Sequence, residues 1–135
     1  MGKRWEERIK DLGNAVTRLG EAIEDSKKYR IESLKDGVIQ RFEFSVELSW
    51  KTLKQYLESE GVVNITTPKQ TIREGFAKEI LGNPDIWIDM LNDRNLTSHI
   101  YDSSVSEKIF ENITKRYFDE IKRNYEYLKS LEVMD

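Results

Sequence analysis

The chain has 135 residues, with 22 Lys and Arg against 25 Asp and Glu, for a formal net charge of −3. This length is typical of one domain, and we expect residues 1–135 to form a single domain. The absence of cysteine excludes a disulfide framework, a thiolate zinc site and a cysteine nucleophile. The acidic balance argues against the broad basic face of non-specific nucleic-acid binders. No segment has the roughly 20 apolar residues of a membrane span, which predicts a soluble protein. Because a chain without cysteine does not require an oxidising compartment, we expect it to be cytoplasmic.

The first half of the chain shows two long runs of apolar residues at helical spacing. The first run extends from Trp5 to Ile23 and marks one narrow stripe of a helix. The second extends from Val38 to Leu57 and is apolar on more than one side, which predicts a central helix of the core. The charged, weakly patterned stretch between them, residues 24–36, predicts a helix end or connection.

The second half contains turn and capping signals between shorter helical segments. Residues 61–67 predict a loop, and Thr67-Pro68-Lys69-Gln70 predicts a capping box that opens a helix running to about Leu81. Gly82-Asn83-Pro84 ends that helix and starts the next, which should reach Ser98 or His99. A second capping box, residues 104–107, is expected to open a long last helix. With no strand pattern, the chain should form an all-α antiparallel up-and-down bundle of four to five helices.

The most informative segment is residues 93–101, at the predicted end of the fourth helix. It holds the only histidine, His99, with Arg94 before it and Tyr101 after it. An arginine offers a fork of donors that suits a phosphate, and an imidazole that titrates near neutrality can give or take a proton. A metal-free ribonuclease needs these two groups, for acid–base catalysis and for charge stabilisation at phosphorus.

Helical spacing alone does not bring Arg94 and His99 together. At about 100° per residue the two diverge by roughly 140°, whereas Asn95 and His99 lie roughly 40° apart. Arg94 must therefore reach round by its length, or the helix must end near residues 97–98, or the pairing must cross a subunit boundary. On spacing alone, a structural histidine favoured by the helix dipole is the more frequent case.

Two sets of carboxylates also need an interpretation. One set, Asp85, Asp89 and Asp93, forms a ridge at i, i+4 and i+8 of the predicted fourth helix. A site for a hard cation is one interpretation of this ridge. The more frequent case is that Asp85 stabilises the helix N-terminus and that the other two pair with basic residues. Glu43 and Glu47 lie on the otherwise apolar second helix. Their side chains either support Arg94 or Tyr101 from behind, or form the solvated edge of the helix. Four aromatic residues are better anchors of the core or of a dimer interface than base-stacking platforms: Phe42, Phe44, Trp50 and Trp87.

Three segments carry a family resemblance. Arg94-Asn95-Leu96-Thr97-Ser98-His99-Ile100-Tyr101 resembles the signature of HEPN-domain proteins, in the form with a tyrosine two residues after the histidine. The stretches 41–54 and 87–91 resemble the HepT-type toxins, a branch known as nucleotidyltransferase substrate-binding proteins. Together these segments extend the resemblance over nearly the whole chain.

The resemblance implies a HEPN-like homodimer whose two motifs face each other in a cleft, acting as a metal-independent endoribonuclease on RNA, without a cofactor. Arg94 and His99 would be the catalytic pair and Asn95 a supporting residue. The implied partner is a small nucleotidyltransferase that acts as antitoxin by transferring AMP to Tyr101. The alternative is a non-catalytic subunit that binds a substrate or nucleotide for that enzyme.

Overall fold

The computed structural model describes residues 3–134, and the side chains of residues 5–132, and within this range it contains helices and no strand. Residues 1, 2 and 135 of the expected single domain lie outside the described part. The helices are α1 (Lys3–Tyr29), α2 (Glu32–Ser59), α3 (Pro68–Ala77), α4 (Pro84–Asn95), the 3₁₀ turn η1 (Thr97–His99), α5 (Ser103–Asn112), the π-helical turn η2 (Ile113–Tyr117) and α6 (Phe118–Met134). This confirms the all-α prediction.

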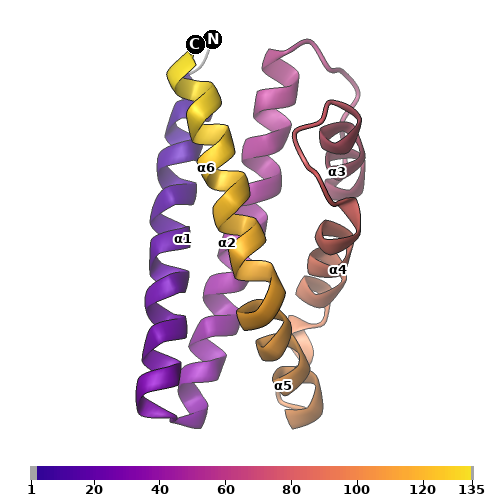
Figure 1. Ribbon diagram of the computed structural model, residues 1–135. Coiled ribbons are helices and arrows are strands. Elements are labelled where there is room, and N and C mark those ends of the chain that lie inside the picture. Colours follow the sequence, from indigo (N-terminus) through magenta and orange to yellow (C-terminus); the bar gives the residue numbers. More distant parts are fainter. Residues whose placement is uncertain (1–2, 135) are drawn as a thin grey trace.

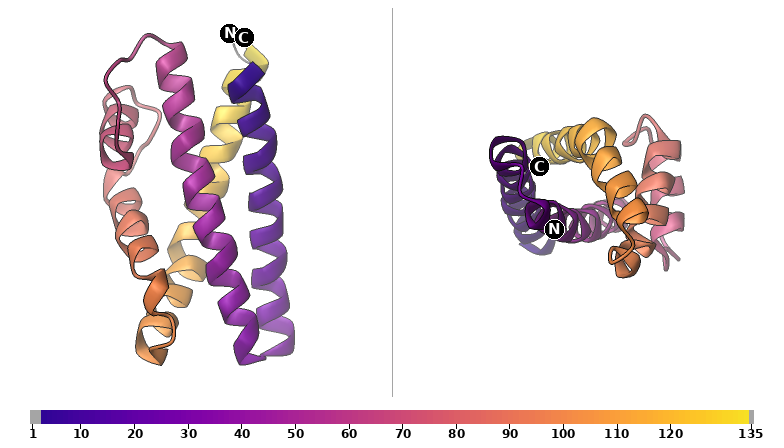
Figure 2. Two further views of the ribbon diagram at one scale, coloured as in Figure 1. Left: turned by 180° about the vertical axis from the view of Figure 1, so that it is seen from behind. Right: turned by 90° about the horizontal axis from the view of Figure 1, so that it is seen from below.

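The helices form an up-and-down bundle (Figure 1). The chain runs down α1, up α2, down through α3 and α4 in succession, and up through α5, η2 and α6. Figure 2 shows α3 and α4 lying along the side of α2 that is away from α1. None of the described helices combines the length and apolar character that crossing a bilayer requires.

The predicted apolar runs of the first two helices are buried. All six residues of the α1 stripe are at most 5% exposed: Trp5, Ile9, Leu12, Val16, Leu19 and Ile23. Helix α2 contacts every other α-helix of the described part, which confirms the prediction that it is central. Its position means that a side chain on α2 can reach the end of α4, where the histidine motif lies.

The predicted helix end or connection within residues 24–36 is confirmed, because α1 ends at Tyr29 and only Arg30 and Ile31 separate it from α2. Arg30 adopts a left-handed backbone with φ of 51°, which ends α1 abruptly. The weak apolar pattern of this stretch reflects two largely exposed helix ends rather than a loop.

Helix α3 ends earlier than expected, at Ala77 rather than near Leu81. Glu79 takes a left-handed conformation with φ of 61°, and the amides of Ile80 and Leu81 both donate to the carbonyl of Gly75. The turn places Leu81 in the core, 2% exposed, so its apolar character reflects burial outside a helix.

Two of the three predicted N-terminal caps are confirmed. Thr67 and Gln70 form the reciprocal capping box of α3, and Asn83 accepts hydrogen bonds from the first turn of α4. The third is wrong: the cap of α5 is Asp102, whose Oδ1 accepts from the backbone N and the hydroxyl of Ser104. The last helix is long as predicted, but the π turn η2 interrupts it.

Candidate functional site

The α-helix that carries the motif ends before the histidine. Helix α4 stops at Asn95 and continues as the 3₁₀ turn η1, so α-helical spacing does not apply between Arg94 and His99. The Thr97 hydroxyl donates to the carbonyl of Arg94 at 2.7 Å, and the His99 amide donates to the carbonyl of Leu96 at 2.9 Å. Of the three sequence alternatives, an early helix end is therefore present. No hydrogen bond or ion pair joins Arg94 to His99 within the described residues.

Arg94 is held by a carboxylate on α2. Its Nη2 lies 2.7 Å from Oε2 of Glu47, and the two side chains are 37% and 29% exposed. The Nε of Arg94 is buried and has no hydrogen-bond partner in the described structure. The guanidinium is thus fixed along one edge while part of it remains open to solvent.

Glu47 also contacts two donors on its own helix. The indole Nε1 of Trp50 donates to Oε2 at 3.2 Å, and Nζ of Lys51 lies 3.4 Å from Oε1. Glu43, one turn earlier, makes no hydrogen bond or ion pair to Arg94 or Tyr101 in the part that the structure describes. The two glutamates that the sequence could not separate therefore differ: one contacts the motif arginine and the other does not.

His99 and Tyr101 form an exposed pair beyond the end of α4. The Nδ1 of His99 lies 3.4 Å from the hydroxyl of Tyr101, and their rings meet edge-on with centroids 5.9 Å apart. Tyr101 is 83% exposed, and Asn95 is exposed as well. An imidazole and a phenol open to solvent are accessible to a large substrate or to a modifying enzyme.

The aspartates of the α4 ridge have partners of different kinds. Asp89 pairs with Arg116 at 2.8 Å, as predicted. The prediction of a basic partner for Asp93 is wrong, because its Oδ2 accepts from the Tyr117 hydroxyl at 2.6 Å and from Nδ2 of Asn112 at 2.9 Å. Among the described residues, no group of three or more His, Cys, Asp or Glu is arranged to hold a metal ion.

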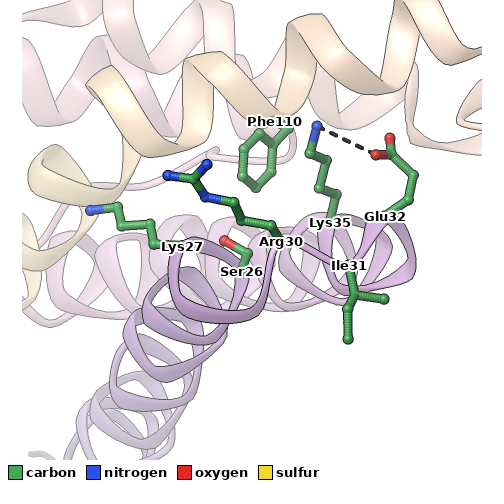
Figure 3. A pocket seen from close by; sticks show the side chains of 7 residues that line it. All are labelled: Ser26, Lys27, Arg30, Ile31, Glu32, Lys35 and Phe110. Carbon is green, nitrogen blue, oxygen red and sulfur yellow. Dashed lines mark ion pairs between the residues drawn. The ribbon is translucent and has the colours of Figure 1, made fainter.

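A pocket of about 390 Å³ lies at the turn between α1 and α2, against α5 (Figure 3). Arg30, Lys35 and Phe110 are among its lining residues, and none of the motif residues lines it. Lys35 is paired with Glu107 at 2.8 Å and with Glu32 at 3.7 Å, so part of the pocket's positive charge is compensated. The pocket is therefore distinct from the motif.

Comparison with known proteins agrees with the fold. A Haemophilus influenzae protein, whose structure was described as revealing the fold of a substrate-binding domain of a nucleotidyltransferase, superposes with a TM-score of 0.81 at 24% identity, covering 90% of this chain and 98% of its own. A crystal structure from Thermus thermophilus gives a TM-score of 0.70 at 26% identity, covering 88% of this chain and 96% of its own. Both resemble this chain over most of its length.

Similarity in sequence is more specific. A Haemophilus influenzae protein named probable ribonuclease HepT is 30% identical over 86 residues, which cover 61% of this chain and 59% of that relative. The alignment therefore spans less than two thirds of the relative's length. The model of the family described as nucleotidyltransferase substrate binding protein like matches residues 7–130. The chain belongs to the nucleotidyltransferase substrate-binding-protein-like family.

Proposed function

We propose that the protein is a metal-independent endoribonuclease toxin of the HepT type, with Arg94 and His99 as catalytic residues. The observation that carries the proposal is the combination of an exposed imidazole with an arginine whose guanidinium is fixed by Glu47 yet partly open. A relative named probable ribonuclease HepT supports this interpretation.

The chemistry requires a base, an acid and a cation at the scissile phosphate. The base removes the proton from the 2′-hydroxyl, whose oxygen attacks phosphorus, and the acid protonates the departing 5′-oxygen. His99 supplies one proton-transfer group per chain, and Arg94 stabilises the charge on the phosphate oxygens. Because one chain has one histidine, a symmetric homodimer with two copies of His99 would divide the two proton transfers.

An exposed aromatic residue on α2 supports the homodimer. Phe44 is 57% exposed, and with Arg18 and Arg41 it lines a groove of about 390 Å³ between α1 and α2. Phe44 lies three residues before Glu47, so these two side chains are neighbours on the surface of α2. Glu47 is the residue that holds Arg94. A second chain that covers Phe44 would bring its own motif close to Arg94, as the proposed composite cleft requires.

The family description supports a nucleotidyltransferase as the protein partner, and we propose that this enzyme transfers AMP to Tyr101. The Tyr101 hydroxyl lies beside Nδ1 of His99 at 3.4 Å and is accessible to an enzyme. An AMP group attached there would place a phosphate and a purine against the imidazole. RNA would then be excluded by both bulk and charge, and the toxin would be silenced.

The test is cleavage of RNA by the purified protein and by two variants, His99→Ala and Ser98→Ala. Ser98 is an exposed neighbour in the same 3₁₀ turn and serves as the matched control. We expect His99→Ala to lose at least about a hundredfold in rate, the usual range for a lost acid–base group, with the oligomeric state unchanged. Undiminished cleavage by His99→Ala would refute the assignment.

The second candidate is a non-catalytic subunit that presents a substrate or nucleotide to the nucleotidyltransferase. It is favoured by the structural neighbour, which was described as a substrate-binding domain. Incubation with the partner nucleotidyltransferase and ATP separates the two functions. AMP transfer to the wild type but not to Tyr101→Phe, without RNA cleavage at any stage, would favour the binding subunit.

A further inference from the structure

Two adjacent residues at the end of α4 are held by different partners. Arg94 is bonded to Glu47 on α2, whereas Asp93 is bonded to Asn112 on α5 and to Tyr117 in η2. The backbone carbonyl of Asp93 accepts the amide of Leu96 at 2.9 Å, which begins the turn that leads to His99. The contacts of Asp93 therefore fix the backbone from which both motif residues project.

The π turn η2 is what allows two donors to reach one carboxylate oxygen. In an α-helix, residues five apart, such as Asn112 and Tyr117, diverge by about 140° around the axis. Hydrogen bonding from i to i+5 in a π turn brings residues five apart to the same side. Both side chains donate to the same oxygen, Oδ2 of Asp93, at 2.9 and 2.6 Å. A regular helix at this place would turn one of the two donors away.

The surroundings of Tyr117 keep its hydroxyl as a hydrogen-bond donor to Asp93. It is 1% exposed, and its ring stacks on Phe42 with centroids 5.4 Å apart and planes 15° apart. Burial, together with the hydrogen bond to Asp93, raises the pKa of the Tyr117 phenol well above its ordinary value. The hydroxyl therefore keeps its proton at every pH at which the protein would act, and it donates to Asp93 throughout.

From this geometry we infer that Asn112 and Tyr117, brought together by the π turn, are positioning residues for the Arg94 and His99 site. They act through Asp93 and the turn that follows it, and neither makes a hydrogen bond or an ion pair with the side chain of Arg94 or His99 in the described structure. This inference rests on the proposed function for its effect on catalysis. Its effect on the order of residues 96–99 is independent of RNA cleavage.

The experiment compares Tyr117→Phe and Asn112→Ala with the wild type. Tyr125→Phe is the matched control, because it removes a hydroxyl from a partly buried tyrosine of α6 that makes no contact with Asp93. Two properties are measured: the kinetics of RNA cleavage, as kcat and KM, and the rates of amide hydrogen exchange at Leu96 and His99. Thermal unfolding of each variant verifies that the fold is retained.

We expect kcat to fall by about ten- to a hundredfold in Tyr117→Phe, with KM nearly unchanged, because small misplacements of catalytic groups have effects of this size. Amide exchange should accelerate at Leu96 and His99 but not in α1. Asp93→Ala should behave in the same way, and Asp93→Asn, which retains an acceptor oxygen, should recover most of kcat. Tyr125→Phe should change neither property.

Unchanged exchange at Leu96 and His99 in both Tyr117→Phe and Asn112→Ala overturns the inference, whatever the cleavage rates. A wild-type protein that leaves RNA intact overturns the proposed function instead, and the exchange rates then decide the positioning role alone. A kcat that falls equally in Tyr125→Phe also contradicts the inference, because the loss would then be a general effect of removing a tyrosine hydroxyl from η2 or α6.

Discussion

Replacing Glu47 by alanine should destabilise the protein by about 1–2 kcal/mol. A hydrogen bond between charged partners contributes about 1.5–3 kcal/mol, but the Glu47 and Arg94 side chains are 29% and 37% exposed, so solvent reduces the value. The substitution also removes the acceptor of the Trp50 indole N–H. It leaves the guanidinium of Arg94, whose Nε already has no partner in the described structure, without its carboxylate.

Urea unfolding at one fixed protein concentration measures this loss, since the stability of a homodimer depends on concentration. Glu47→Gln retains an acceptor oxygen and should lose about half as much as Glu47→Ala. Glu58→Ala is the control, because Glu58 lies on the same helix, is 48% exposed and pairs with Lys54 only at 3.9 Å. Its cost should stay within about 0.5 kcal/mol, and an equally small cost for Glu47→Ala would refute the reasoning.

Three further predictions concern packing, capping and assembly. Gly75→Ala should lower the free energy of unfolding by about 1–3 kcal/mol, since the added Cβ would lie 2.8 Å from Cδ2 of Leu53. Gly37→Ala, whose Cβ would meet no atom within 4 Å, should raise the free energy of unfolding by up to about 1 kcal/mol. Urea unfolding in which both variants match the wild type would contradict the packing prediction. The pKa of the Asp102 carboxyl is lowered mainly by the hydrogen bond from the Ser104 hydroxyl, with a smaller effect from the Ser104 backbone amide. The ionised carboxyl therefore stabilises the folded protein at neutral pH, and this contribution is lost as pH falls below the ordinary value of 3.8. Asp102→Ala should therefore have a lower Tm than the wild type at neutral pH and a similar Tm in acid, whereas Asp102→Asn should retain the cap. A Tm difference that persists in acid would contradict the assignment of this stabilisation to the ionised carboxylate. Phe44→Asp should convert the proposed homodimer to monomer in analytical ultracentrifugation, while Phe76→Asp, at a 49% exposed aromatic residue of α3, should not; a Phe44→Asp protein that remains dimeric would place the interface elsewhere.

Much of the fold could be predicted from periodicity and caps. The α1 stripe, the central α2 and the caps at Thr67 and Asn83 follow from local rules, because the residues that decide them lie within one or two turns of each other. The end of α3, which was predicted near Leu81, depends on a single left-handed residue, Glu79. Glu79 is neither glycine nor asparagine, so the sequence contains no conventional signal for a turn there.

The candidate site could be predicted only in part. The motif and the two α2 glutamates were visible as residue types, but the choice of Glu47 as the partner of Arg94 depends on how α2 packs against α4. The roles of Asn112 and Tyr117 were missed, because a π turn changes the register of a helix without a recognisable sequence signal. A phenol or amide partner for Asp93 is a tertiary property that helical spacing cannot show.

The most direct test of the central claim is an analysis of the product ends after incubation of RNA with the protein in the presence of a metal chelator. Attack by the 2′-oxygen with proton transfer by His99 predicts 2′,3′-cyclic phosphate and 5′-hydroxyl ends. It also predicts that a 2′-deoxy nucleotide at the cleaved position blocks the reaction, and that His99→Ala yields no products. Products with 3′-hydroxyl and 5′-phosphate ends, or cleavage at the 2′-deoxy position, would contradict the account.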